Sequence, residues 1–414
     1  HYRDPSGPRS TKPKTVPMFT YRPSRDLLHL TVLANYCEVW LAKEGHEGAI
    51  GINLLEKVQL PNLASLYGAM LAGVDVVLMG AGIPREIPMV LDRFAQQQTA
   101  RIRLAVEGAT STDDYYAEFD PRSVMNTELP EIKRPKFYAI VSSEVLAKAL
   151  LARSTGAIDG FVVEGHIAGG HNAPPRGGIK LDESGQPIYG QRDMANLSAF
   201  AELGVPFWIA GGQSGPDKLS QAIAVGAEGV QVGTDFAFCE ESGFEPSLRE
   251  QVLRQVYQGS AVVHTDPLAS PTGFPFKVVQ LEGTMSDPLE YAERPRLCQL
   301  GFLRRLYKRE DGTVGYRCPG EPEEDFLRKG GKAEEMEGKK CLCNALIANI
   351  GMPQTHKDGY REKPLVTAGD SLGELHHYLT PERMHYTAKD VIEYILGEFA
   401  SDQHTTSDAC HTDC

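Results

Sequence analysis

The sequence has no apolar run long enough to cross a membrane, no excess of basic residues and few cysteines. No stretch approaches the roughly 18 to 20 uninterrupted apolar residues of a membrane-spanning helix, and the first residues contain no apolar signal-peptide core. The 42 basic and 55 acidic residues give a net charge of −13, which disfavours nonspecific binding to nucleic acid or anionic lipid. Eight cysteines in 414 residues are too few for a disulfide-stapled secreted domain. We therefore expect a cytoplasmic protein that acts on a small-molecule substrate, without nucleic-acid or membrane partners.

Glycine, in contrast, is abundant. It supplies 41 of the 414 residues, against an average of about 7% in globular proteins. This excess predicts many tight turns or close contacts between backbone and ligand. Apolar residues make up 41% and charged residues 23% of the chain, a balance that excludes intrinsic disorder.

Eight short apolar runs between residues 25 and 240 predict β-strands. Most of the intervals between them have helical periodicity, and residues 61–73, 143–156 and 215–226 each end on a glycine suited to a helix C-terminus. Apolar strands that alternate with amphipathic helices indicate parallel strands buried on both faces. Eight such units in about 210 residues match an α/β fold of the TIM, or (β/α)8, barrel class, with a doubly wound open sheet as the alternative. The runs are His29–Ala34, Gly48–Asn53, Asp75–Gly80, Arg101–Val106, Lys136–Val141, Asp159–Gly165, Pro206–Gly212 and Glu228–Thr234.

The alternation of predicted strands and helices sets the expected domain boundaries. Residues 1–24 are expected to form a flexible lead-in, 25–240 the barrel, 241–400 a C-terminal α-helical and irregular cap or lid, and 401–414 a mobile tail. Within the cap, residues 245–259 look helical, and the charged segment Gly312–Lys340 is expected to be an exposed excursion with little apolar surface. Thr387 and Asp390 form a capping-box pattern that predicts a final helix.

Two neighbouring strand ends carry glycines where a barrel of this class binds its ligand. The seventh run ends in Gly211 and Gly212, and the eighth ends in Gly233 and Thr234. Barrels commonly build a phosphate site at these two positions from backbone N–H groups and a helix N-terminus, and a side chain there would hold the backbone away from the phosphate. The pair of motifs therefore favours a phosphate cradle over simple turns.

The sixth run continues into the most informative segment of the chain. Glu164 is followed by Gly-His-Ile-Ala, then by Gly169, Gly170 and His171. These glycines allow the chain to fold over a flat ligand, and a histidine directly after them would project into the barrel mouth. A neutral imidazole at that point could accept a proton or donate a hydrogen bond near neutral pH. We assign this role to His171 and not to His166.

At this point the chain resembles the nitronate monooxygenase family, formerly called 2-nitropropane dioxygenases, which are FMN-dependent barrel enzymes. The resemblance rests on Glu164–His171, on Ile209–Gly212 and on Gly226–Thr234, together with Asn53 and Gly80–Pro84, and covers about residues 30–240. It implies a flavoprotein oxidoreductase with FMN as cofactor, with the phosphate on Gly211, Gly212, Gly233 and Thr234 and with His171 as the active-site base or hydrogen-bond donor. The expected cofactor-binding residues also include Asn53, Glu164, Gly169, Gly170 and Gln231, and no metal is assigned to the site.

The resemblance implies oxidation of a nitronate or nitroalkane with O₂, and it leaves alternatives open. FMN-dependent enoyl-thioester reductases, including the trans-acting enoyl reductases of synthases, share the Gly-Gly-His segment and the barrel but need an external electron donor. A homo-oligomer or a synthase partner is compatible with either activity. Without flavin, a barrel enzyme acting on a phosphorylated substrate would need a lysine or a carboxylate pair, for which Glu164 and Glu107 are the candidates. An inosine-monophosphate dehydrogenase type lacks its nucleophilic cysteine here, and a noncatalytic flavin- or acyl-binding protein is the remaining alternative.

Four of the cysteines fall within one stretch of the predicted cap. Cys298, Cys318, Cys341 and Cys343 are the thiols concerned. Sets of four thiolates suit Zn²⁺ or an iron–sulfur cluster, but the usual Cys-x₂-Cys spacing is absent. Buried free thiols are therefore the preferred interpretation.

Overall fold

The computed structural model describes residues 16–125 and 128–398. Within these residues the chain forms two compact units. The first contains residues up to 161 together with 268–274 and 294–344, and the second contains 162–267, 275–293 and residues from 345 onward. The expected cap residues thus contribute to both units, and the division into barrel and cap stays a prediction. The expected tail 401–414 and most of the lead-in lie outside the described residues.

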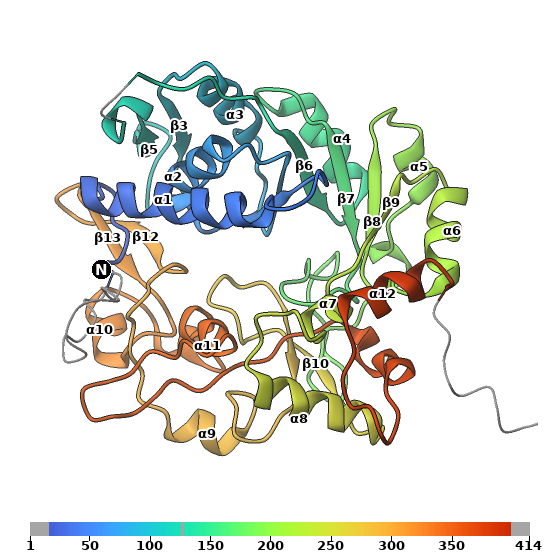
Figure 1. Cartoon of the computed structure of the whole chain (residues 1–414). Helices are drawn as coiled ribbons and strands as arrows, with labels where there is room; N and C mark the ends of the chain where they lie inside the picture. The colour runs from blue at the N-terminus through green and yellow to red at the C-terminus, as the bar shows by residue number, and fades with distance from the viewer. Residues whose placement is uncertain (1–15, 126–127, 399–414) are drawn as a thin grey trace, which may run out of the picture. The chain divides into compact units, whose positions relative to one another are not determined.

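Predicted parallel strands occur in both units, and Figure 1 labels those between residues 136 and 231. In the first unit β1 (Gly51–Leu55), β2 (Val76–Gly80) and β6 (Lys136–Val141) are adjacent and parallel, in that order. The second unit contains the last three residues of β7 (Gly160–Glu164), together with β8 (Phe207–Ala210) and β9 (Gly229–Gln231). Strands β8 and β9 pair in parallel. The chain is therefore an α/β protein with parallel strands, and six of the eight predicted strands are confirmed.

The first of the two incorrect strand predictions, His29–Ala34, lies inside helix α1 (Arg25–Ala42). Ser24 caps this helix by accepting a hydrogen bond from the N–H of Leu27. Helix α1 packs against α2 (Gln59–Leu71), where a Cβ atom on Gly68 would lie 2.3 Å from the Val32 carbonyl oxygen. A cap and a close helix contact therefore override the β propensity of the run.

The second incorrect prediction is Arg101–Val106, which is not part of the parallel sheet. Its first residues form β3 (Ala100–Arg103), which pairs antiparallel with β5 (Tyr116–Phe119), and its end belongs to β4 (Val106–Glu107), which pairs with β12 (Arg305–Lys308). Residues along β3 alternate between buried and exposed positions. Such alternation is typical of a strand with one solvated face, as in an antiparallel pair.

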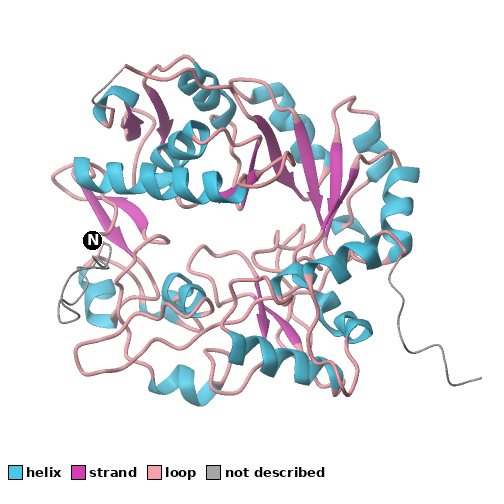
Figure 2. Cartoon of the chain, viewed as in Figure 1, coloured by secondary structure: helices cyan, strands magenta, loops and turns pink. Residues whose placement is uncertain are grey.

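The predicted helices are present with small changes in their bounds. Figure 2 shows the helices of the chain in cyan. The capping box at Thr387 and Asp390 is formed and begins α12 (Ala388–Ile395). The expected exposed excursion Gly312–Lys340 is wrong, because it contains β13 (Val314–Arg317) and the buried residues Phe326 and Met336. The other α-helices are α3 (Ile87–Ala95), α4 (Glu144–Arg153), α5 (Leu197–Ala201), α6 (Pro216–Ala224), α7 (Thr234–Ala237), α8 (Pro246–Tyr257), α9 (Pro288–Glu293), α10 (Glu323–Arg328) and α11 (Leu342–Ala348). The remaining strands are β10 (Val263–Asp266) and β11 (Phe276–Val279), and the short 3₁₀ helices are Pro121–Ser123, Gln191–Asp193, Ala333–Met336 and η4 (Asp370–Tyr378).

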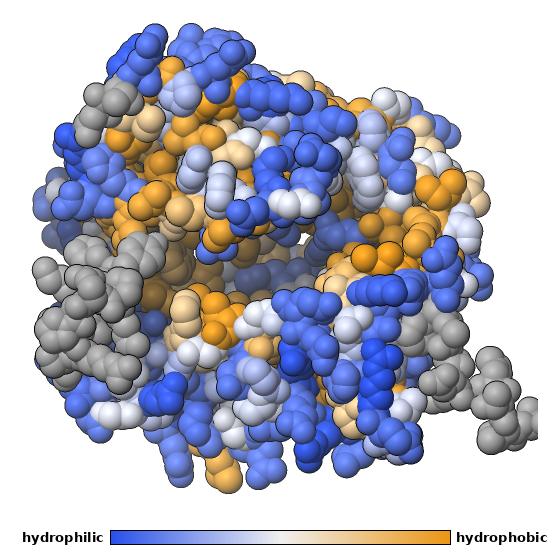
Figure 3. Space-filling model, in the orientation of Figure 1, coloured by the Kyte–Doolittle hydropathy of each residue, from blue (hydrophilic) through white to orange (hydrophobic). Residues whose placement is uncertain are grey.

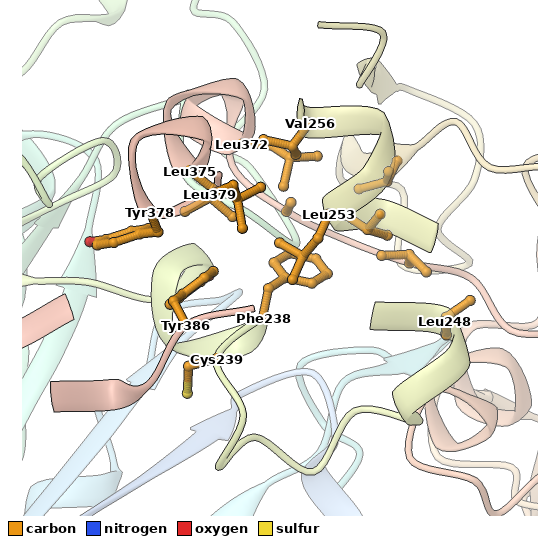
Figure 4. Packing of buried hydrophobic residues seen from close by; sticks show 14 of the residues in the cluster. Phe238, Cys239, Leu248, Leu253, Val256, Leu372, Leu375, Tyr378, Leu379 and Tyr386 are labelled. Carbon is orange, nitrogen blue, oxygen red and sulfur yellow. The ribbon is translucent and has the colours of Figure 1, made fainter. Parts of the chain in front are cut away.

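The second unit has a core in which α8 packs against η4 (Figure 4). Leu253 and Val256 of α8 face Leu372 and Leu375 of η4, with Phe238 beside them. All five side chains are almost completely buried. On the face drawn in Figure 3, hydrophilic side chains cover most of the outer surface. In this core, helix η4 therefore packs against the segment that follows β9.

Candidate functional site

The second unit contains a cavity of about 280 Å³ at the carboxyl ends of β7, β8 and β9. This edge of a parallel sheet is where α/β proteins bind ligands. Eight of the nine predicted cofactor-binding residues line the cavity: Glu164, Gly169, Gly170, Gly211, Gly212, Gln231, Gly233 and Thr234. The ninth, Asn53, lies within β1 of the first unit, which continues two residues beyond it to Leu55.

Three of the cavity glycines adopt backbone conformations that other residues rarely take. Their φ angles are +78° at Gly170, +90° at Gly211 and +60° at Gly212. At a fourth position, 169, there is no room for a side chain. A Cβ atom on Gly169 would lie 2.9 Å from the carbonyl carbon of Ala368. The glycines thus let the backbone itself form the wall of the cavity.

The geometry at the ends of β8 and β9 suits an anion. Among the described residues, the backbone N–H groups of Gly212 and Gly233 donate no hydrogen bond to protein, and a Cβ atom built on Gly233 would meet nothing within 4 Å. No lysine or arginine occurs among the described residues that line the cavity. An anion bound here would therefore be held by amide groups rather than by a cationic side chain.

Glu164 is the acidic side chain at the end of β7 and lines the same cavity. It has no hydrogen-bond partner among the described side chains, and burial raises its pKa to about 7. The carboxyl group is thus protonated below neutral pH and can donate a hydrogen bond to a ligand.

His171 follows the glycines but is not among the residues that line the cavity. Its backbone forms an antiparallel bridge with Phe276, and the two rings meet edge to face with centroids 4.8 Å apart. The bridge is extended by a hydrogen bond of 2.9 Å from the N–H of Lys277 to the carbonyl of Gly170. Burial lowers the pKa of His171 to about 4, so the imidazole is neutral near pH 7. His166, in contrast, stacks on Tyr189 with centroids 4.3 Å apart.

Sequence reasoning missed a third wall of the cavity, which comes from residues 367–371. Thr367 accepts a hydrogen bond of 2.9 Å from the N–H of Gly170, and the N–H of Gly369 donates one of 2.9 Å to the hydroxyl of Thr234. The N–H of Asp370 donates to the carbonyl of Ile167 at 2.9 Å. The first two of these contacts join residues that are 197 and 135 positions apart in the chain. No local pattern marks residues 367–371 as part of a site, apart from a glycine next to an aspartate.

An ion pair between a buried lysine and a partly exposed aspartate lies beside this wall and was also missed. Lys277, of which 2% is exposed, bonds both carboxylate oxygens of Asp370 at 2.6 and 2.7 Å and the hydroxyl of Thr265 at 2.6 Å. Asp235 lines the cavity itself, and burial raises its pKa although Ser214 and Tyr378 donate hydrogen bonds to it. The site therefore combines two buried acids of raised pKa, Glu164 and Asp235, with backbone amides that donate to no described protein acceptor.

The four clustered cysteines are free thiols in the first unit or at its edge. Burial raises the pKa of Cys298 to about 11 and that of Cys318 to about 12. In residues 16–125 and 128–398, no group of three or more histidine, cysteine or acidic side chains is placed to hold a metal ion. In the same residues, no helix combines the length and apolar character that a membrane crossing requires.

Comparison with known proteins agrees with the sequence motifs. Residues 119–265 match the family model described as nitronate monooxygenase. A probable nitronate monooxygenase of Bacillus subtilis is 32% identical over 123 residues, which is 30% of this chain and 33% of the relative. A nitronate monooxygenase of Pseudomonas aeruginosa is 30% identical over 136 residues, 33% of this chain and 37% of the relative. The chain thus matches about a third of the length of these curated relatives.

Among solved structures, the enoyl reductase domain of MlnA from the macrolactin biosynthesis cluster of Bacillus amyloliquefaciens aligns with 91% of this chain. The alignment covers 86% of that domain at 12% identity, with a TM-score of 0.48. The segment that matches the family model includes the cavity residues from Glu164 to Asp235. The resemblance to the nitronate monooxygenase family is therefore confirmed for residues 119–265.

Proposed function

We propose that this chain is an FMN-dependent oxidoreductase of the nitronate monooxygenase type, which oxidises a nitronate or nitroalkane with O₂. One observation carries the proposal: eight of nine residues selected from sequence motifs line a single cavity, and this cavity includes residues of the segment that matches the family model. Asn53 remains a proposed FMN contact on the basis of its motif.

The residues of the cavity fit the phosphate and ribityl part of FMN. A phosphate at the ends of β8 and β9 would accept hydrogen bonds from the amides of Gly212 and Gly233, whose donors have no protein acceptor among the described residues. A cavity of about 280 Å³ lies just below the usual range for ligand pockets, roughly 300 to 1,000 Å³, so it suits this part of the cofactor better than the whole of it. When bound, the isoalloxazine ring supplies the redox chemistry.

Two side chains, Glu164 and His171, can donate or accept a proton near neutral pH. Glu164, protonated below about pH 7, can donate a hydrogen bond to a heteroatom of the cofactor. His171, neutral above about pH 4, can remove the proton next to a nitro group or donate a hydrogen bond to a nitro oxygen. The positive φ of Gly170 and the bridge to Phe276 hold the histidine backbone in place. We assign catalysis to His171 and cofactor binding to the cavity residues.

The direct test is the absorbance spectrum of the purified protein, followed by oxygen uptake. We expect a yellow protein whose released flavin is FMN and which consumes O₂ with alkyl nitronates or propionate-3-nitronate in the absence of NADPH. A matched preparation of Gly212→Val should lose FMN. Protein that contains no flavin and binds none when FMN is added would refute the proposal. Reduction of an enoyl thioester that depends on NADPH, without nitronate oxidation, would assign the same site to the enoyl-reductase class.

A further inference from the structure

The first unit contains a second and larger cavity, with a volume of about 420 Å³. It shares no lining residue with the cavity at the ends of β7, β8 and β9. Most of the residues that line it are apolar. They include Phe19, Leu60, Pro61, Val106, Phe302 and Leu306. Its volume lies within the range of small-molecule pockets, roughly 300 to 1,000 Å³.

The charges around this cavity do not cancel. Arg305 pairs with Glu335 at 2.9 Å and more distantly with Glu107 at 3.5 Å, while Glu107 is bound by Arg317 at 2.5 Å. Arg305 and Arg317 are thus neutralised by two carboxylates. Arg304, which also lines the cavity, has no acidic partner among the described residues.

The guanidinium of Arg304 is held in place by neutral groups. Its Nε donates to the carbonyl of Gly301 at 3.1 Å, one terminal nitrogen donates to the carbonyl of Phe19 at 2.5 Å, and the group lies 4.7 Å from the centre of the Tyr316 ring. A guanidinium has five N–H donors, so three of them donate no hydrogen bond to the described residues. A fixed guanidinium with unused donors can donate charge-assisted hydrogen bonds to a carboxylate.

Lys57 adds a second positive charge at the cavity wall. Its side chain is exposed, and the neighbouring Glu56 carboxyl, which accepts a hydrogen bond of 3.0 Å from Gln59, also interacts electrostatically with Lys57. Arg305 is already paired with carboxylates, so Arg304 is the basic residue of the cavity wall whose charge no described acidic side chain balances. That charge favours an anion at this wall.

We propose that this cavity binds an organic carboxylate with a compact apolar body, such as a medium-chain or arylalkyl carboxylate, with its carboxylate on Arg304. The apolar wall would take the body of the ligand, and Lys57 would strengthen the attraction at the rim. The inference does not depend on flavin binding, because its residues and its test are separate from those of the other cavity.

The test is calorimetric titration of the full chain with octanoate and 4-phenylbutyrate. Octanol serves as the probe without charge, and acetate as the probe without an apolar body. We expect both carboxylates to bind, with octanol and acetate much weaker. Arg304→Gln should weaken octanoate binding by about 10- to 100-fold, the scale of a lost hydrogen bond to a charged group. Arg309→Gln, on the exposed part of the same segment, is the matched control and should bind as the wild type does.

A second variant keeps the test independent of the folding of Arg304→Gln. Ala105 lines the cavity, and Ala105→Phe would fill part of it while leaving every charge in place. We expect this variant to lose octanoate binding and to retain its thermal unfolding temperature. The proposal is overturned if octanoate does not bind, if neither Arg304→Gln nor Ala105→Phe changes its affinity, or if acetate binds as tightly as octanoate.

Discussion

Gly369 offers the sharpest test of how residues 367–371 form the third wall of the cavity at the ends of β7, β8 and β9. The residue is buried, and a Cβ atom added to it would lie 2.9 Å from the carbonyl oxygen of Ile167, 3.2 Å from the hydroxyl of Thr234 and 3.3 Å from the nitrogen of Gly169. Its backbone needs no unusual dihedral angle, because its φ is −76°. The substitution Gly369→Ala therefore tests close approach of two backbones and nothing else.

The expected cost follows from these contacts. Two of the three neighbours are backbone atoms that cannot rotate away, so the segments must separate by a few tenths of an ångström. Overpacking of this kind costs about 1 to 3 kcal/mol. The separation would also strain the hydrogen bonds from Gly369 to Thr234 and from Asp370 to Ile167, both 2.9 Å long, each of which contributes about 1 kcal/mol. We expect Gly369→Ala to destabilise the protein by about 2 kcal/mol and to weaken FMN about tenfold or more.

The assay measures thermal unfolding of the FMN-free protein and FMN affinity from the quenching of flavin fluorescence. Gly373→Ala is the matched control, because this exposed glycine lies four residues further along the same segment and its added Cβ would meet nothing within 4 Å. The control should match the wild type in both measurements. If Gly369→Ala retains wild-type stability and FMN affinity, or if Gly373→Ala is equally damaging, the described packing of residues 367–371 is wrong.

Three further predictions concern single side chains of the second unit. His171→Ala should retain FMN and reduce turnover by about 10²- to 10⁴-fold, the usual loss for an acid–base group; an unchanged rate with every candidate substrate would leave the histidine a structural role. The pKa of Glu164 is raised to about 7, so its carboxyl group ionises as pH rises through 7 and can no longer donate a hydrogen bond. The FMN dissociation constant should therefore increase there, and Glu164→Gln should remove that increase. Identical pH profiles of FMN affinity for the two proteins would contradict the assignment. Asp370→Ala leaves the ammonium of Lys277 buried without a counter-ion and should lower the free energy of unfolding by about 3 kcal/mol, a figure at the low end because the carboxylate is 40% exposed. Lys277→Met should lower it much less. Urea denaturation of both variants measures the difference, and equal losses of stability would contradict the reasoning.

The secondary structure was predictable wherever local signals and packing agreed. The capping box at Thr387 and the paired glycines after β8 are local, and the structure has both. His29–Ala34 failed because the run is short and apolar, and such a run cannot be distinguished from a buried helix segment by its periodicity. Its helical state depends on a cap and on a contact with Gly68 that lies 36 residues away.

The cavity residues from Glu164 to Thr234 could be selected in advance because strand ends and glycine motifs are written in contiguous sequence. Parallel strands bring their carboxyl ends to one edge, so residues at three strand ends converge without any further information. The sequence thus determined which glycines and which carboxyl group line much of this cavity. It also determined that an anion would meet backbone donors there, since glycines were the residues at those ends.

Only the tertiary structure decided what closes this edge and how the charges are balanced. Thr367 and Gly369 reach Gly170 and Thr234 through hydrogen bonds across 197 and 135 residues, and Lys277 meets Asp370 across 93 residues. The pKa values of Glu164 and His171 depend on burial, which is a property of the packed chain and not of its local pattern. The packing of η4 against α8 in the core likewise joins distant segments. A pattern along the chain does not show which distant segments will share a core.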